Sequence, residues 1–178
     1  MQPKELNHPP KWEDTLAYDF PNLVLKQPAL LDFGAAGKGY CIDIVAGILA
    51  QKNIQNFCID AGQDILYKNI KKEPLRVGLE NPNNFEQVIG VAEICNQSIC
   101  GSSGSRRKWA TFHHIMHPFA LESVKNIVAT WAIAPTALEA DALASALFFV
   151  PGPFLRLEYN FEYIILYSKP VIDDFHAI

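Results

Sequence analysis

The sequence lacks the features that mark several classes of protein. Its 178 residues contain no Cys-x-x-Cys pair, no run of basic residues and no apolar stretch near the ~20 residues that a membrane-spanning helix requires. The net charge is -4 and both signs are mixed along the chain, so neither nucleic acid nor a membrane span is expected. No secretion signal opens the sequence. We therefore expect a cytoplasmic protein if the chain is complete, and a periplasmic or membrane-anchored one if it is part of a longer chain.

Cysteine is scarce, with four residues at positions 41, 58, 95 and 100. Each lies in an apolar run, which predicts buried free thiols in a reducing compartment. Cys95 and Cys100 flank an expected turn, so a disulfide between these two remains an alternative. Of all residues, 49% are hydrophobic, which is enough for one domain with a single buried core.

The hydrophobic pattern predicts an α+β fold, with two helices among many strands. Residues 1–29, with five prolines, are expected to form an irregular lead-in in which only residues 23–25 are strand-like, and residues 30–178 one domain. A helix is predicted over 38–52 from apolar residues at positions i, i+3, i+4 and i+7. A second helix is predicted after Thr136, because Thr136 and Glu139 form a capping box. Strands are predicted at residues 30–33, 57–59, 64–67, 75–80, 88–95, 98–100, 109–116, 124–133 and 163–168.

A glycine-rich turn lies between the predicted strand 30–33 and the helix that follows. Gly34, Gly37 and Gly39 allow the backbone to turn tightly and to approach a ligand, and Lys38 stands among them. Backbone N–H groups at a helix N-terminus, together with a lysine, suit a phosphate or pyrophosphate. The spacing matches neither the nucleotide P-loop nor Gly-x-Gly-x-x-Gly, so plain turn chemistry remains the alternative.

The second predicted helix carries a carboxylate and a hydroxyl on one face. Asp141 and Ser145 are four residues apart and therefore project from the same side of the helix. One interpretation places Asp141 on the solvent side of an alanine-rich helix. The other is a site for a hard cation, which backbone carbonyls and phosphate oxygens would complete, and which suits Mg²⁺.

Two further polar segments have residues that could take part in chemistry. Residues 102–105 (Ser-Ser-Gly-Ser) precede three basic residues and could bind an anionic ligand or form a solvated loop. His113, His114 and His117 fall within five residues, and on a strand His113 and His117 would share one face. Zinc is one interpretation, and a single histidine acting as a general base near neutral pH is the one we favour.

Taken in order, six motifs resemble those of the ApbE family, the FAD:protein FMN transferases. Residues 32–43 (Asp-Phe-Gly-Ala-Ala-Gly-Lys-Gly-Tyr-Cys-Ile-Asp) resemble the family's Asp-Leu/Phe-Gly-Gly-Ile-Ala-Lys-Gly-Tyr-x-x-Asp. Residues 60–65 (Asp-Ala-Gly-Gln-Asp-Ile) resemble Asn-Ala-Gly-Gly-Asp-Ile, and residues 76–82 (Arg-Val-Gly-Leu-Glu-Asn-Pro) resemble Arg-Val-Gly-Ile-Glu-Asp-Pro. The last three motifs, at residues 102–104, 113–118 and 134–146, resemble Thr-Ser-Gly, His-His-Ile-Ile-Asp-Pro and Ala-Pro-Thr-Ala-x-x-Ala-Asp-Ala-Leu-Ala-Thr-Ala.

The resemblance implies an ApbE-like flavin transferase fold, with a mixed or antiparallel sheet and a few packed helices. It also implies an activity and the residues that carry it. A member of this family binds FAD with Mg²⁺, transfers FMN to a threonine or serine hydroxyl of a target flavoprotein, and releases AMP. Matched residue by residue, Asp141, Ser145 and the carbonyl of Gly37 would hold the metal, and His114 would deprotonate the acceptor hydroxyl. The residues that the resemblance places against the flavin nucleotide are Gly37, Lys38, Gly39, Ser102, Ser103, Gly104 and Thr136.

Departures from the family pattern leave alternatives open. Residues 30–178 resemble the C-terminal part of the family domain, so its N-terminal half is expected from a second chain, a second copy or residues outside this sequence. His117 replaces the aspartate of the His-His motif, Arg106 replaces a tyrosine, and Ser145 replaces a threonine. The alternatives to a transferase are a flavin-binding relative, either non-catalytic or resembling an FAD pyrophosphatase, and a structural domain with a vestigial site.

Overall fold

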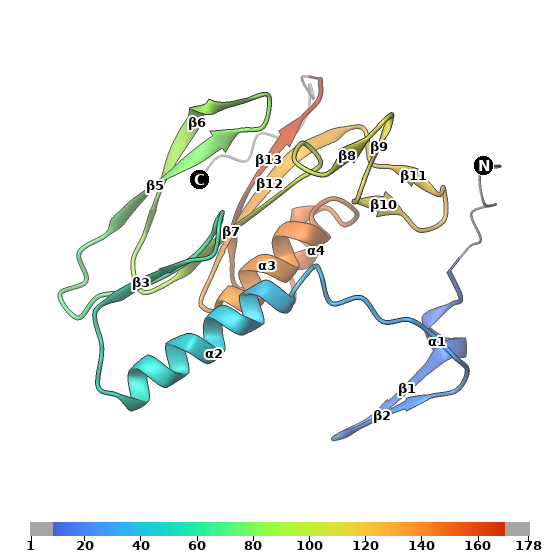
Figure 1. Ribbon diagram of the computed structural model, residues 1–178, viewed down its shortest axis with the longest axis horizontal. Coiled ribbons are helices and arrows are strands. Elements are labelled where there is room, and N and C mark those ends of the chain that lie inside the picture. The colour runs from blue at the N-terminus through green and yellow to red at the C-terminus, as the bar shows by residue number, and fades with distance from the viewer. Residues whose placement is uncertain (1–8, 170–178) are drawn as a thin grey trace.

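The computed structural model describes residues 9–169, and a five-stranded antiparallel sheet forms its centre (Figure 1). The strands lie in the order β13-β12-β7-β4-β3, and each pairs antiparallel with its neighbours. Their bounds are β3 (Phe57–Asp60), β4 (Asp64–Lys68), β7 (Ser98–Ser103), β12 (Ile127–Ala134) and β13 (Glu162–Tyr167). The predicted α+β class with an antiparallel sheet is confirmed.

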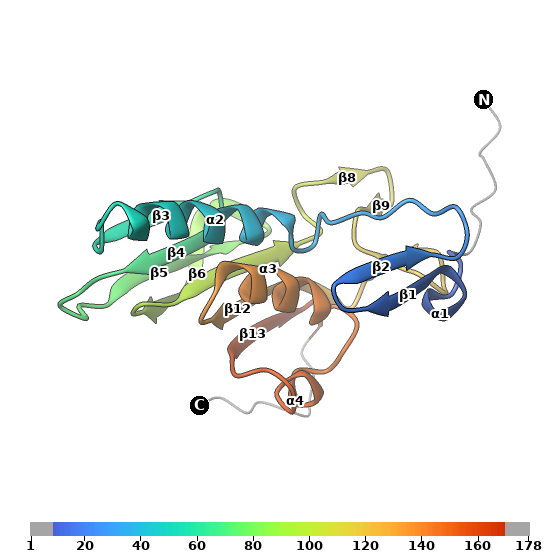
Figure 2. The same ribbon diagram turned by 90° about the horizontal axis from the view of Figure 1, so that it is seen from below.

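Two helices cover one face of this sheet, and a two-stranded ribbon covers the other. Helix α2 (Gly37–Gln51) packs Ile42 against Leu66 of β4. The alanine-rich helix α3 (Ala137–Ala146) packs on small residues of β7 and β12, which allows a close approach. On the opposite face, the ribbon β5 (Leu75–Asn81) and β6 (Asn84–Ile94) buries Leu79 and Ile94 against Ile99 of β7. Figures 1 and 2 show these three layers.

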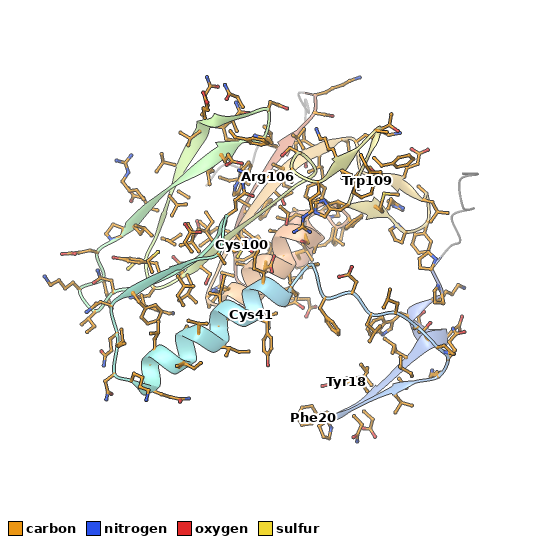
Figure 3. All side chains as sticks on the ribbon, viewed as in Figure 1. Tyr18, Phe20, Cys41, Cys100, Arg106 and Trp109 are labelled. Atoms are coloured by element: carbon orange, nitrogen blue, oxygen red, sulfur yellow. The ribbon has the colours of Figure 1, made fainter. Side chains whose placement is uncertain are left out.

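The remaining elements are short. An N-terminal unit of α1 (Trp12–Thr15), β1 (Leu16–Asp19) and β2 (Asn22–Leu25) projects from the body (Figure 2). Tyr18 and Phe20 lie on this hairpin, well away from the sheet (Figure 3). The other short elements are β8 (Lys108–Trp109), β9 (Phe112–His113), β10 (Met116–His117), β11 (Glu122–Ser123) and α4 (Gly152–Leu155). The prediction of an irregular segment is therefore wrong for residues 12–19, which form α1 and β1, whereas the strand-like piece predicted at residues 23–25 lies in β2. The domain boundary at residue 29 stays a prediction.

Two predicted strands are wrong. Residues 30–33 form an extended loop, in which Leu30 is 96% and Phe33 69% exposed. Three apolar residues have no period that separates a strand from a loop, and no strand within residues 9–169 pairs with this segment. Residues 109–116 are divided among β8, β9 and β10, because Ala110 has a φ of +54° and turns the chain back between β8 and β9.

The predicted burial of the cysteines is correct only in part. All four thiols are free, so the alternative disulfide between Cys95 and Cys100 is not formed. Cys100 is buried under α3 (Figure 3), whereas Cys41 and Cys58 are exposed on α2 and on the edge strand β3. Within residues 9–169, no helix has both the length and the apolar character needed to cross a membrane.

Candidate functional site

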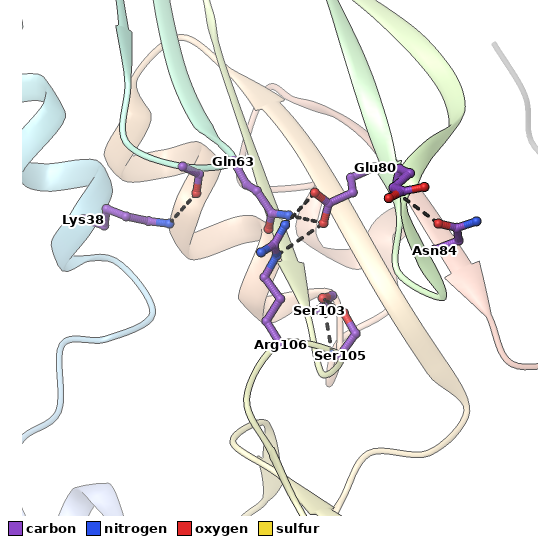
Figure 4. A network of polar contacts seen from close by, with 9 residues as sticks. Lys38, Gln63, Glu80, Asn84, Ser103, Ser105 and Arg106 are labelled. Atoms are coloured by element: carbon purple, nitrogen blue, oxygen red, sulfur yellow. Dashed lines mark hydrogen bonds and ion pairs between the residues drawn. The ribbon is translucent and has the colours of Figure 1, made fainter.

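The first turn of α2 begins where the glycine-rich loop ends. The N–H group of Gly37 donates to the carbonyl of Phe33 at 2.7 Å, and the helix starts from this turn. Lys38 then reaches the turn before β4, where its Nζ donates to the carbonyl of Gly62 at 3.3 Å (Figure 4). The same Nζ lies 2.6 Å from Oδ2 of Asp64. The lysine therefore connects the start of α2 with the start of β4 and keeps a side open to solvent.

Asp64 is a buried carboxylate that the sequence analysis did not select. Its side chain is fully buried, and its Oδ1 has no hydrogen-bond partner among the described residues. Burial raises the pKa of this carboxyl, and the ammonium group of Lys38 offsets part of the rise. Its position in the Asp-Ala-Gly-Gln-Asp-Ile motif was the one signal in the sequence that pointed to it.

Gly39 brings α2 into contact with α3. Its N–H group donates to Oδ2 of Asp141 at 2.9 Å, a bond between residues 102 positions apart. A Cβ atom at position 39 would overlap the carbonyl oxygen of Ala137 and lie 2.9 Å from Cβ of Asp141. Glycine is required here because the two helix backbones approach too closely for any side chain.

Asp43 and Thr136 fix the start of α3. The Oδ1 atom of Asp43 accepts from the N–H of Ala137 at 2.9 Å, and its Oδ2 accepts from the N–H of Leu138 at 2.8 Å. The hydroxyl of Thr136 accepts from the N–H of Glu139 at 3.2 Å, which confirms the predicted cap. A carboxylate that caps a helix N-terminus also interacts favourably with the helix dipole. The contact of Thr136 with a ligand stays a prediction.

Asp141 is buried, so the interpretation that placed it on the solvent side is wrong. Only 5% of the residue is exposed. Burial raises the pKa of Asp141 and the nearby charge of Asp64 adds to the rise, while the Gly39 hydrogen bond and Lys38 oppose it. Two carboxyls with raised pKa values and one lysine thus lie close together under the α2 N-terminus.

Ser145 and Ser102 connect α3 with the central sheet next to this group. Their Oγ atoms are 3.1 Å apart. Ser145 lies one turn after Asp141 on α3, so this hydrogen bond connects α3 with strand β7. At the end of β7, Ser103 and Ser105 exchange a 2.7 Å hydrogen bond through their hydroxyls (Figure 4). The carboxylate and hydroxyl oxygens here are hard donors of the kind that Mg²⁺ takes together with phosphate oxygens. Within the described residues, no group of three or more His, Cys, Asp and Glu side chains could hold a metal ion.

The neighbouring histidines have separate roles. The His113 ring packs against Gly104, where a Cβ would lie 2.7 Å from the ring. Its Nε2 is 2.8 Å from the carbonyl of Val124, and its Nδ1 accepts from the N–H of Ile115 at 3.3 Å. A neutral ring with its proton on Nε2 satisfies both bonds, so His113 is structural.

His114 is exposed and stands apart from the carboxylates. Partial burial lowers its pKa, and the charge of Arg107 lowers it further, so the ring is neutral and able to accept a proton at neutral pH. Among the described residues, no hydrogen bond or ion pair links His114 with Lys38, Asp141 or Ser145. The structure therefore connects Gly39 with Asp141 and Ser102 with Ser145, while the roles predicted for these residues and for His114 stay predictions.

His117 occupies the position of the aspartate in the motif His-His-Ile-Ile-Asp-Pro, which residues 113–118 resemble. Its Nδ1 accepts from the N–H groups of Phe119 and Ala120, at 3.3 and 3.2 Å. An aspartate in a turn accepts the same kind of hydrogen bond from the backbone, so the turn is retained although histidine replaces aspartate at position 117. The predicted common face of His113 and His117 is not formed, because the segment that contains them is broken into short strands.

Comparison with known proteins assigns this arrangement to a family. The model of the ApbE family matches residues 3–156. The chain belongs to the ApbE family. It is 29% identical over 146 residues to the FAD:protein FMN transferase of Escherichia coli (strain K12), an alignment that covers 78% of this chain and 40% of that protein. It is 30% identical over 131 residues to the enzyme of the same name from Haemophilus influenzae, covering 66% of this chain and 37% of that protein.

Solved structures show the same fold. The ApbE protein of Thermotoga maritima superposes with a TM-score of 0.75 at 22% identity, over 86% of this chain and 54% of that one. The flavin transferase ApbE of Vibrio cholerae superposes with a TM-score of 0.67 at 20% identity, over 85% of this chain and 56% of that one. This ApbE chain thus spans about two fifths of the length of these two curated relatives and just over half of these two solved chains.

Proposed function

We propose that this chain carries the nucleotide and metal side of an FAD:protein FMN transferase. The observation that carries the proposal is the first turn of α2. Lys38 pairs with Asp64 there, and the next residue, Gly39, donates to Asp141. One helix start thus collects a partly exposed cation and two buried carboxyls, beside the hydroxyl of Ser145. The relatives of this chain named FAD:protein FMN transferase give the reaction class.

The pyrophosphate of FAD would lie over the start of α2, where the partly exposed ammonium group of Lys38 neutralises its charge. Asp64 holds Lys38 in place through the ion pair. Asp141, Ser145 and the carbonyl of Gly37 would hold Mg²⁺, whose charge polarises the phosphoryl group when it is bound. Phosphoryl-type transfer needs this positioning and charge neutralisation more than any covalent step by the protein.

His114 is proposed as the base. In the reaction, the hydroxyl oxygen of a threonine or serine in the acceptor protein bonds to the phosphorus of the FMN half. The bond from that phosphorus to the AMP half breaks, and AMP leaves with the bridging oxygen. The hydroxyl proton goes to His114, which is neutral beforehand because its pKa is lowered.

Incubation of the chain with FAD and an acceptor flavoprotein, with and without Mg²⁺, tests the proposal by measuring AMP release and covalent flavin on the acceptor. We expect Mg²⁺-dependent release of AMP, lost in Asp141→Ala and strongly reduced in Ser145→Ala. Glu139→Gln removes a carboxylate from the same helix and serves as the matched control. Equal turnover in Asp141→Ala and Glu139→Gln would refute the assignment of the metal.

A hydrolytic variant of the same chemistry is the second candidate. Its support is the exposed position of His114, which leaves room for water in place of an acceptor hydroxyl. The assay separates the two, since hydrolysis yields AMP and free FMN without labelled acceptor. FAD binding without AMP would indicate a non-catalytic flavin-binding protein.

A further inference from the structure

One carboxylate outside the proposed metal site contacts both loops that border it. Glu80, at the end of β5, accepts from Nε2 of Gln63 at 2.7 Å through its Oε1. Its two oxygens also face Arg106, with Nη2 at 2.6 Å from Oε2 and Nε at 3.3 Å from Oε1. Figure 4 shows the side chains of Gln63 and Arg106 both reaching the carboxylate of Glu80.

The arginine is further ordered by an aromatic ring. The guanidinium carbon of Arg106 lies 4.5 Å from the ring centre of Phe85 on β6. A planar guanidinium stacked on a ring and bonded through two nitrogens has little freedom left, unlike an ordinary surface arginine. The β5–β6 ribbon therefore holds the segment after β7 through both charge and stacking.

Gln63 is held in an uncommon backbone conformation. Its φ is +76°, in the left-handed region that favours glycine, and the resembling motif has glycine at this position. Its own carbonyl accepts from the N–H of Gly101 on β7 at 3.2 Å. Both Gln63 and Arg106 are thus departures from the family pattern, and both contact the same carboxylate.

The two loops joined by Glu80 contact different residues of the candidate site. The turn with Gln63 also presents the carbonyl of Gly62 to Lys38 and leads into Asp64. The segment with Arg106 follows directly on Ser102 and Ser103, of which Ser102 contacts Ser145. A movement of either loop would change the distance between the lysine and the serine hydroxyls.

We propose that Glu80 is a positioning residue, which fixes the separation of these two loops and thereby the affinity of the site for FAD. The inference rests on the proposed function only in its second half. The first half, coupling between the loops, is a property of the protein without ligand. The two halves are tested by separate measurements.

Hydrogen–deuterium exchange of the free protein measures the coupling. In Arg106→Ala we expect exchange to become roughly three- to tenfold faster in residues 60–64 as well as in 102–107. Arg76→Ala is the matched control, because Arg76 forms a 3.9 Å ion pair with Glu93 on the exposed side of the same ribbon. Faster exchange confined to residues 102–107, or equal changes in both variants, would overturn the coupling.

FAD titration measures the consequence for the site. We expect Glu80→Gln, which keeps the shape and removes the ion pair, to weaken FAD binding severalfold while Arg76→Ala leaves it unchanged. The charge-reversed pair Glu80→Arg with Arg106→Glu should restore most of the affinity, since the ion pair is re-formed. Unchanged affinity in Glu80→Gln, or no rescue in the reversed pair, would overturn the positioning role. If the unaltered chain binds no FAD, the proposed function fails together with this second half, and the exchange experiment alone decides the coupling.

Discussion

Replacing Asp141 by asparagine tests two effects of the buried charge, its destabilisation of the ligand-free protein and its proposed role in binding Mg²⁺. Asparagine keeps an oxygen that can accept from the N–H of Gly39 and removes the negative charge. Burial raises the pKa of Asp141 above its value in the unfolded chain, so the native state binds the extra proton between the two pKa values. Stability without metal therefore falls as the pH rises through that interval, by about 1.4 kcal/mol for each unit of pKa shift.

From this sign, Asp141→Asn without metal should be as stable as the unaltered protein at acid pH and more stable at neutral pH. With Mg²⁺ and FAD the order should reverse. A ligand at 100 times its Kd adds about 2.7 kcal/mol, which is a rise in Tm of about 5 to 10 °C for a protein of this size. The unaltered chain should show this Mg²⁺-dependent rise, and Asp141→Asn should lose it.

Thermal unfolding at acid and neutral pH, with FAD present and Mg²⁺ added or chelated, is the assay. Glu139→Gln controls for loss of a negative charge from α3. The reasoning is refuted if Mg²⁺ raises the Tm of Asp141→Asn as much as that of the unaltered chain. It is also refuted if the metal-free Asp141→Asn protein is markedly less stable at neutral pH, since that result would make the carboxylate a structural group.

Three further predictions concern neighbouring residues. Gly39→Ala should lower stability by about 1–3 kcal/mol through overlap with α3, whereas Gly47→Ala, with open space around it on the same helix, should raise it by about 0.5–1 kcal/mol in denaturant unfolding. His114→Ala should slow AMP release more than it weakens FAD binding, whereas His113→Ala should lower the Tm. If instead His113→Ala slowed AMP release and His114→Ala lowered the Tm, His113 would be the base and His114 the structural residue. Lys38→Met removes the cation that pairs with the buried carboxylate of Asp64. It should therefore weaken FAD binding at least tenfold in a titration, and lower the stability more at neutral than at acid pH in thermal unfolding.

The sequence predicted the parts of this fold that local patterns determine. The helix over 38–52 and the cap at Thr136 follow from spacing and side-chain chemistry within a few residues, and both are present. The burial of Asp141 depends on Gly39, 102 positions away, and no local pattern reports such a partner. The same holds for Glu80, whose contacts come from two loops that only the folded sheet brings together.

The two buried carboxyls favour a binding site over a purely structural domain. Asp64 has an oxygen without a hydrogen-bond partner among the described residues, and burial raises the pKa of both carboxyls. Packing alone gains nothing from such charges, because asparagine would fit with similar shape at a lower desolvation cost. A bound cation would pair with the carboxylates, so that the cost of burying their charge would be offset when the ligand is present. The energetics at the start of α2 therefore support the metal and nucleotide site, since Lys38 and the Gly39 N–H offset only part of the desolvation cost of the two carboxylates.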